Sequence, residues 1–234
     1  MESDKETALE MNTREPQYQF LVDIREREGL TKLGIMANQV WHDDPRRLAF
    51  TLARYKFVSK MLSGRNRVLE IGCADAFASR IVLQAVGHLT AVDFDPLFIA
   101  DVRARRDEKW PIETHVHDMV EGPFDGKFDA AYALDVLEHI KAENEDRFLA
   151  HINASLPANG VAIYGMPSLE SQTYASPGSK AGHVNCKTGR DLEATLSRHF
   201  ENVFLFSMND EVVHTGFHPM AHYLIGLCVT PKKA

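Results

Sequence analysis

The 234-residue sequence predicts an α/β fold with a doubly wound, mostly parallel sheet of seven strands and an antiparallel last strand. Two observations predict this fold. Short apolar runs alternate with segments of helical periodicity from residue 64 onward, which is typical of βαβ units around a parallel sheet. The last two apolar runs, 202–208 and 222–229, are close together in the chain, so we expect them to pair in an antiparallel manner.

The remaining elements follow at ordinary spacing. The first strand, 67–71, is an apolar run that ends at a glycine, and the helix near 96–107 begins at Pro96, a residue favoured in the first helical turn. A loop rich in Ser, Gly, Pro and Lys, 167–182, follows the fifth strand. Further strands are expected at 89–93, 112–116, 128–134 and 160–165, and further helices at 76–86, 143–155 and 188–198.

The stretch RNRVLEIGCAD, 65–75, is the point around which the rest is organised. A buried strand, a tight turn with small residues and a helix start bring free backbone N–H groups to a ligand. Glu70 stands inside the strand, and Asp75 stands in the turn after Gly72. A phosphate would gain nothing from these carboxylates, so the turn favours a ligand that carries positive charge.

Three more acids stand at the ends of later strands. Asp93 follows Gly72 by 21 residues, about the spacing of an acid that binds ribose hydroxyls in nucleotide-binding βαβ units. Asp118 and Asp135 follow the third and fourth strands. Because parallel strands end at one edge of a sheet, the four strand-end acids, which are Glu70 and these three, are expected to line one ligand site.

The stretches VLEIGCADAFAS, AVDFDP, HVHDM and FDAAYALDVLEHI, taken together, resemble the class I S-adenosylmethionine-dependent methyltransferases, whose fold is Rossmann-like. Ala74 and Ala76 stand where that family usually has its second and third turn glycines. The resemblance implies S-adenosyl-L-methionine as the cofactor, with its methionine part at the turn and a methyl acceptor near Asp135. The residues that it implies for the cofactor site are Glu70, Gly72, Cys73, Asp75, Asp93 (ribose), Phe94, Asp118 (adenine), Met119 and Asp135, with Cys73 as a packing residue and not a nucleophile.

Methyl transfer requires alignment of the nucleophile, the methyl carbon and sulfur, and removal of any proton on the nucleophile. Histidine is the ordinary base at neutral pH. His183, at the end of the long loop, is the preferred base, and His139 with Asp135 are the other catalytic candidates. A polar substrate mouth is expected to be lined by Tyr164, Tyr174, His214, His218 and His222. Gly216 and Pro219 interrupt the spacing of the last three, so no metal site is predicted.

Residues 1–63 are predicted to be an N-terminal helical lid or extension, and 64–234 the methyltransferase domain. Residues 1–16 are charged and poor in apolar side chains, so we expect a frayed start before a weak helical pattern at 18–33. Asp44 and Pro45 predict the start of the next helix. Trp41 and His42 could contact the substrate as part of the lid, or Trp41 could simply pack a helix onto the sheet.

Composition limits the possible partners. The net charge of −7 argues against a broad nucleic-acid surface, and no stretch is long and apolar enough to predict a membrane span. Three cysteines without CxxC spacing fit a reducing compartment, so a cytoplasmic protein is expected. The small-molecule substrate is the expected partner, and both a monomer and a homodimer remain open.

Three other functions compete with a small-molecule methyltransferase. A nicotinamide-dependent oxidoreductase would use the glycine turn and Asp93 but leaves Glu70, Asp118 and Asp135 without a role. A nucleic-acid methyltransferase would be expected to have an Asn- or Asp-Pro-Pro-aromatic motif after the fourth strand, where this chain has ALDVLEH. A catalytically silent binding module would keep the fold and bind the cofactor weakly or not at all.

Overall fold

The computed structural model describes residues 12–232. The chain forms two compact units, which divide between Leu33 and Gly34. In the first unit, a short 3-10 helix η1 (Pro16–Tyr18) leads into α1 (Gln19–Glu28), where the helical pattern was weak. The second unit contains the sheet and every other element. The predicted division between residues 63 and 64 therefore falls inside this second unit, and most of the segment expected to be frayed lies outside the described residues.

The sheet confirms the predicted fold class. Its strand order is β3-β2-β1-β4-β5-β8-β6-β7, and the first five strands in this order are parallel. β8 runs antiparallel to β5, and β6 runs antiparallel to β8. The strands are β1 (Arg67–Ile71), β2 (His88–Asp93), β3 (Glu113–Val116), β4 (Ala130–Leu134), β5 (Val161–Pro167), β6 (Phe200–Asn209), β7 (Val212–His214) and β8 (Tyr223–Pro231).

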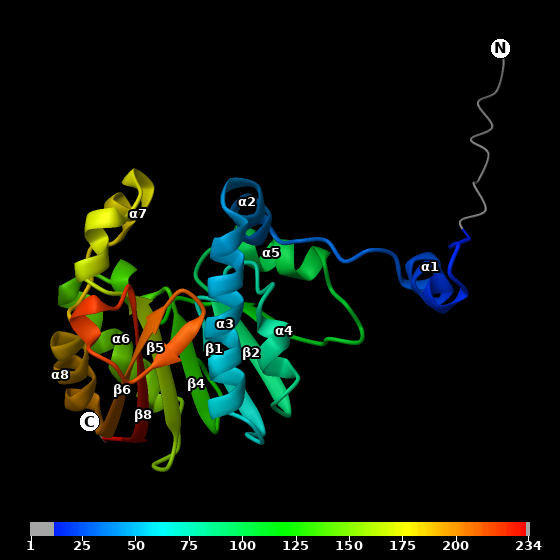
Figure 1. Cartoon of the computed structure of the whole chain (residues 1–234). Helices are drawn as coiled ribbons and strands as arrows, with labels where there is room; N and C mark the ends of the chain where they lie inside the picture. The colour runs from blue at the N-terminus through cyan, green and yellow to red at the C-terminus, as the bar shows by residue number, and fades with distance from the viewer. Residues whose placement is uncertain (1–11, 233–234) are drawn as a thin grey trace. The chain divides into compact units, whose positions relative to one another are not determined.

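Helices cover both faces of the sheet (Figure 1). On one face, α3 (Pro45–Met61), α4 (Ser79–Leu83) and α5 (Pro96–Ala104) pack on alternate strand residues such as Val68, Leu89 and Ala91. On the other face, α6 (Ala142–Ala154) and α8 (Gly189–His199) pack on the intervening residues, such as Leu69 and Ala131. The central strands are apolar on both faces because both faces are covered.

Several elements differ from the sequence prediction. An eighth strand, β7, forms a hairpin with β6 at a turn where Asp210 has a φ of 50°. The loop expected at 167–182 contains the 3-10 helix η3 (Glu170–Tyr174) and the short helix α7 (Pro177–Gly182). The remaining short elements are α2 (Ile35–Asp43), η2 (Leu137–His139) and η4 (His218–Met220).

The start of α3 confirms the predicted helix boundary. Asp44 is the N-cap, its side chain accepts a hydrogen bond from the backbone N–H of Arg46, and Pro45 occupies the first helical turn. Within residues 12–232, no helix combines the length and the apolar character that crossing a membrane would require. In Figure 1, α2 and α7 rise above the same edge of the sheet, and the site described next lies at that edge.

Candidate active site

The turn after β1 keeps an unusual backbone shape with alanines in place of glycines. Gly72, Ala74 and Ala76 all have positive φ, at 69°, 45° and 49°. Positive φ is a conformation that glycine adopts without cost and alanine adopts at a cost. A Cβ at Gly72 would also collide with the side chain of Val136. The two alanines therefore adopt a strained backbone conformation, which neighbouring residues hold in place.

Asp93 is one of these neighbours. Its carboxylate accepts hydrogen bonds from the backbone N–H of Ala74 at 2.8 Å and of Asp95 at 2.9 Å, and the side chain is buried. The acid at the end of β2 thus holds the turn after β1 in place. Asp93 therefore lies where the ends of the parallel strands β1 and β2 adjoin, which is the position that the sequence predicted.

Glu70 lies behind the turn, in the interior of the protein. The side chain is only 1% exposed because residue 70 faces α3, where the Tyr55 hydroxyl donates a 2.8 Å hydrogen bond to it. Burial raises the pKa of the Glu70 carboxyl to about 7, and the hydroxyls of Ser79, Tyr55 and Tyr132 oppose part of this rise. The carboxyl is buried against the Tyr55 hydroxyl of α3 and does not line the cavity described below, and the role of Glu70 in cofactor binding stays a prediction.

Asp75 joins the turn to α2. Its carboxylate accepts hydrogen bonds from the backbone N–H of Ala37 at 2.7 Å and of Phe77 at 3.1 Å. Asp101 accepts a third bond, from the backbone N–H of Ile35 at 3.3 Å. Two carboxylates therefore satisfy N–H groups of the first turn of α2, where the positive end of the helix dipole favours negative charge.

A partly buried ion pair follows β4. Both carboxylate oxygens of Asp135 lie within 3.0 Å of one guanidinium nitrogen of Arg54, and the guanidinium stacks 3.8 Å above the ring of Tyr223. Burial lowers the pKa of Arg54 and Asp135 raises it, with a net rise. Asp135 itself has a φ of 57°, so its side chain leaves the strand end at an unusual angle. Arg54 holds this acid at the strand end.

Two histidines and a buried glutamate come together beside this pair. The rings of His139 and His183 lie 5.1 Å apart, and each Nδ1 is hydrogen bonded to an oxygen, of Gly182 at 2.9 Å and of Gln172 at 2.8 Å respectively. Glu138 is fully buried, and neither of its carboxylate oxygens has a hydrogen-bond partner. Burial and the charge of Asp135 raise the pKa of Glu138 well above its usual value, and burial and His139 lower that of His183.

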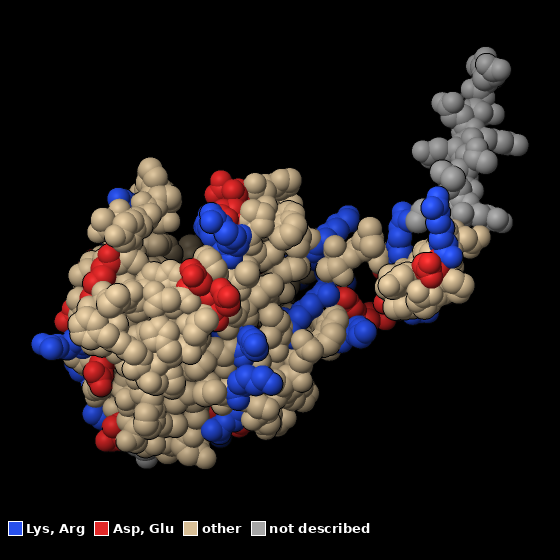
Figure 2. Space-filling view, viewed as in Figure 1, with Lys and Arg blue, Asp and Glu red and all other residues tan. Residues whose placement is uncertain are grey.

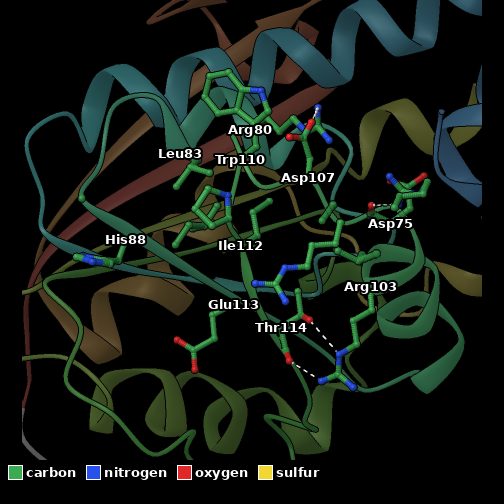
Figure 3. Close-up of a pocket in the computed structure, with 17 residues that line it drawn as sticks. Asp75, Arg80, Leu83, His88, Arg103, Asp107, Trp110, Ile112, Glu113 and Thr114 are labelled. Atoms are coloured by element: carbon green, nitrogen blue, oxygen red, sulfur yellow. Dashed lines mark hydrogen bonds and ion pairs between the residues drawn. The ribbon is translucent and has the colours of Figure 1, made fainter. Parts of the chain in front are cut away.

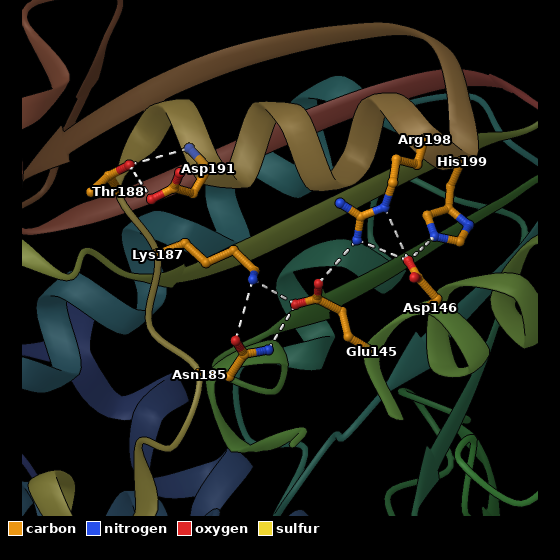
Figure 4. Close-up of polar contacts among 8 residues, drawn as sticks. All are labelled: Glu145, Asp146, Asn185, Lys187, Thr188, Asp191, Arg198 and His199. Carbon is orange, nitrogen blue, oxygen red and sulfur yellow. Dashed lines mark hydrogen bonds and ion pairs between the residues drawn. The ribbon is translucent and has the colours of Figure 1, made fainter. Parts of the chain in front are cut away.

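A second polar network anchors the segment that follows His183 (Figure 4). The Glu145 carboxylate on α6 accepts a hydrogen bond from Asn185 at 2.7 Å, pairs with Lys187 at 2.7 Å and also contacts Arg198. The backbone carbonyl of Glu138 accepts bonds from the N–H groups of residues 184 and 185. These contacts join the loop that carries His183 to α6 and to the strand-end segment.

A cavity of about 480 Å³ lies between α2 and α7, and some of these groups line it. The turn after β1 forms one wall, α2 and α3 form another, and Asp135, Glu138, His139 and His183 form the far end. In Figure 2, a hollow is visible between the two projections that correspond to α2 and α7. The cavity, which is open to solvent on one side, thus connects the turn after β1 to the two imidazoles.

Comparison with known proteins identifies the family. A family model described as "Methyltransferase domain" matches residues 40–201, more than half of the chain. The chain belongs to this methyltransferase family. The match and the fold confirm the resemblance to class I S-adenosylmethionine-dependent methyltransferases, and with it the predicted enzyme class and methyl donor. No curated protein matches the sequence.

Solved structures share the fold at low sequence identity. The N-methyltransferase NodS from Bradyrhizobium japonicum WM9, in complex with S-adenosyl-L-homocysteine, is 17% identical with a TM-score of 0.61, covering 82% of this chain and 91% of its own. The DhpI–SAH complex is 13% identical with a TM-score of 0.61, covering 84% and 92%. A TehB-like SAM-dependent methyltransferase from Corynebacterium glutamicum ATCC 13032 Kitasato is 18% identical with a TM-score of 0.59, covering 83% and 97%.

Of the other predicted cofactor residues, Cys73 lines the cavity, whereas Phe94, Asp118 and Met119 do not. Phe94 is 71% exposed after β2, and Asp118 is exposed after the adjacent strand β3. Met119 is buried, and so is Cys73, whose thiol pKa is raised by burial, as expected of a packing residue and not a nucleophile. Phe94 and Asp118 are both exposed, at the ends of the neighbouring strands β2 and β3. Their assignment to adenine binding stays a prediction.

The substrate residues predicted for the methyltransferase are dispersed. The prediction for Tyr164 is wrong, because this side chain lies in the middle of β5 and is 1% exposed in the core beside Phe200. Tyr174 is 89% exposed, and Trp41 and His42 lie on α2, which reaches the cavity through other residues such as Gln39 and Val40. The roles of these three stay predictions.

The three histidines of the 214–222 segment do not form one cluster. His214 bonds to Asn209 and Gly216, His222 accepts a bond from the backbone N–H of Asp210, and His218 packs against Gly189. None of the three lines the cavity between α2 and α7. His214 and His222 have local hydrogen-bond partners, whereas Nδ1 of His218 has none among residues 12–232, and the spacing by four residues in sequence does not bring the three imidazoles together.

A larger cavity of about 760 Å³ lies elsewhere, between α4, α5 and the edge strand β3 (Figure 3). It shares only Asp75 with the first cavity. Arg80 pairs with Asp107 at its rim, and Arg103 bonds to Thr114. The short length of α4 leaves this face of the sheet open, and the strand-end acids Asp93, Asp118 and Asp135 do not line it.

Sequence reasoning missed the residues that orient the predicted ones. Arg54, Tyr55 and Gln172 contact Asp135, Glu70 and His183 respectively, each from an element of the chain other than its partner's. For Arg54 and Tyr55, a signal existed: a charged and a polar residue within the apolar stripe of a helix are expected to have buried partners. For Gln172, no sequence signal distinguished it from other polar loop residues.

Proposed function

We propose that this methyltransferase transfers the methyl group of S-adenosylmethionine to an oxygen or nitrogen atom of a small molecule in the cytoplasm. The observation that carries the proposal is the cavity of about 480 Å³, which runs from the turn after β1 to the imidazoles of His139 and His183. This volume suits a small ligand. The donor's methionine part would lie at the turn, and the acceptor would lie between Asp135 and the imidazoles.

The chemistry of the walls supports an acceptor that carries a proton. Alignment of nucleophile, methyl carbon and sulfur requires enclosure, which α2 and α3 provide on one side and α7 on the other. A neutral imidazole beside the acceptor can take its proton as the new bond forms. His183 is placed to do so, since Nδ1 is occupied by Gln172 and the other nitrogen, Nε2, is left to act.

Surface charge supports a small acceptor over a nucleic acid. The net charge is −7, and both acidic and basic side chains are present on the face of the second unit shown in Figure 2. A nucleic-acid surface would need Lys and Arg gathered on one face. The three cysteines are free, which supports a reducing compartment.

Calorimetric titration of the purified protein with S-adenosylmethionine, S-adenosylhomocysteine and NAD in parallel tests the proposal. Micromolar binding of the first two, followed by turnover in a screen of hydroxyl- and amine-bearing small molecules, is the expected result. Binding of NAD alone would favour the oxidoreductase alternative. Binding of none, with or without acceptors, would favour the silent module and contradict the proposal.

A further inference from the structure

Glu138, His139 and His183 meet at the far end of the cavity. One nitrogen of each imidazole and one carboxylate oxygen of Glu138 all lie within 4.8 Å of one another. We propose that these three residues bind a divalent transition-metal cation. Two imidazoles and one carboxylate form a set that suits Mn²⁺, Fe²⁺ or Zn²⁺ better than Mg²⁺ or Ca²⁺, which prefer oxygen ligands alone.

The hydrogen bonds of the two imidazoles orient them as metal ligands. Nδ1 of His139 lies 2.9 Å from the carbonyl oxygen of Gly182, and Nδ1 of His183 lies 2.8 Å from the side-chain oxygen of Gln172. Because both partners are acceptors, Nδ1 carries the proton in each ring, and Nε2 keeps its lone pair. Histidines that bind metals ordinarily donate their second N–H to an oxygen in this way.

The buried carboxyl of Glu138 is an independent reason to propose a bound metal ion. The side chain has no exposed surface, and neither carboxylate oxygen has a hydrogen-bond partner. A buried carboxyl without partners costs free energy, so such groups are usually satisfied by hydrogen bonds, water or a bound ion. Glu138 borders the cavity together with both histidines, and one of its carboxylate oxygens lies within 4.8 Å of a nitrogen of each imidazole, so an ion there would satisfy it.

The geometry leaves room for a cation and for more ligands. Metal–ligand distances of about 2.1 Å place two ligand atoms on one ion about 3–4 Å apart. The three ligand atoms lie within 4.8 Å of one another, so they must move closer together by about an ångström to bind one ion. His183 is half-buried on the loop after α7, which can make such a shift, and the backbone carbonyl of Glu138 already accepts hydrogen bonds from residues 184 and 185.

The nearby charges do not oppose the ion. Arg54 is a cation whose charge acts on Glu138, and Asp135 neutralises it through a contact of 2.8 Å. Glu138 then adds one negative charge to two neutral imidazoles. Three protein ligands leave further positions open on the cavity side, as is usual for a catalytic metal and not for a structural one.

The cation would define the acceptor as a hydroxyl group, an inference that rests on the proposed methyl transfer. An acceptor oxygen on the metal loses its proton to solvent water more readily. Its lone pair then forms the bond to the methyl carbon, while the carbon–sulfur bond breaks and its electron pair stays on sulfur. In the metal-bound enzyme His183 is a ligand and not the base, so the two roles can be distinguished.

The test is calorimetric titration of chelator-treated protein with Mn²⁺ and, separately, with Zn²⁺. The variants are Glu138→Gln and His183→Ala, and the control is His214→Ala, which removes an imidazole with its own local partners. Wild type and His214→Ala are expected to bind one ion, and both site variants are expected to bind at least about 100-fold more weakly. Because Glu138→Gln could unfold the core, His183→Ala on the loop provides the same test independently.

S-adenosylhomocysteine is titrated into the same samples. Its binding without metal, together with metal binding that both site variants lose, would support both proposals. Metal binding that is absent in wild type, or equal in His183→Ala and wild type, would overturn the metal site and leave the proposed function intact. Metal binding without any S-adenosylhomocysteine binding would support the metal site and contradict the proposed function.

Discussion

The carboxylate of Asp75 accepts a 2.7 Å hydrogen bond from the backbone N–H of Ala37, and so ties the turn after β1 to the first turn of α2. Gly34 precedes this helix, and a Cβ there would collide with the Asp75 side chain. The helix that lines the cavity is therefore joined to the turn where the donor is proposed to bind. A change in α2 is therefore expected to alter the turn after β1, and a change in the turn to alter α2.

Asp75→Ala should loosen α2 and weaken donor binding together. Loss of a capping carboxylate costs about 0.5–2 kcal/mol, and here the backbone N–H groups of Ala37 and Phe77 would both lose their acceptor. Faster hydrogen exchange over residues 35–43 and a weaker affinity for S-adenosylhomocysteine are the expected results. Asp44→Ala, which removes the cap of α3 at the surface, serves as the control. Unchanged exchange in α2 would show that the tie has no such role.

Asp93→Ala should reduce donor affinity by about 10- to 100-fold while the protein still folds. The variant removes the proposed ribose contact and leaves the N–H of Ala74 without its acceptor, and hydrogen bonds to charged groups contribute about 1.5–3 kcal/mol. Calorimetry with S-adenosylhomocysteine measures the change. Asp95→Ala is the matched control, since Asp95 caps α5 through the N–H of Leu97 and should affect stability alone. Equal affinities in wild type and Asp93→Ala would exclude the ribose assignment.

The mostly parallel sheet and the placement of Gly72, Asp93, Asp118 and Asp135 at one edge could be predicted, because a parallel sheet sends all strand ends to the same side. The partners of these residues could not. Arg54 reaches Asp135 across 81 positions, and His183 meets His139 only because the loop with α7 folds back. Tyr164 was misplaced because β5 is apolar on both faces, so alternation in the sequence cannot show which side chains reach the rim.

The Arg54–Asp135 pair should show coupling in a double-mutant cycle. Arg54→Met alone leaves Asp135 and the buried Glu138 without a nearby cation, so it should cost more than Arg54→Met combined with Asp135→Asn. We expect a coupling free energy of about 1–2 kcal/mol, because the Asp135 side chain is 37% exposed and solvent weakens the pair. Urea unfolding of the four proteins provides the measurement. Additive effects would mean that the pair contributes no coupling.

Glu70 should make the stability of the ligand-free protein depend on pH. Its pKa rises from 4.5 to about 7 on folding, so the folded state resists ionisation. Stability from this group is therefore complete below pH 4.5, falls as the pH rises, and is constant again above about 7. The full difference amounts to roughly 3 kcal/mol.

Glu70→Gln provides the comparison, because the amide oxygen can still accept from Tyr55 and its NH₂ group faces the hydroxyls of Ser79 and Tyr132. The variant should gain stability relative to wild type between pH 5 and 8, measured by urea unfolding at each pH. Other titrating groups are common to both proteins and cancel in the difference. A difference that is constant across this range would show that Glu70 is ionised in the folded protein with an ordinary pKa.

His183→Ala should slow methyl transfer without changing donor affinity. Removal of a positioned base lowers turnover by about 10²- to 10⁴-fold, and His183 lies at the end of the cavity opposite the turn that is proposed to hold the donor. Single-turnover rates with an acceptor from the screen, together with titration of S-adenosylhomocysteine, separate the two effects. A rate equal to that of wild type would remove His183 from the reaction, whether as base or as metal ligand. Activity of the wild type that persists in excess chelator would favour the base over the ligand.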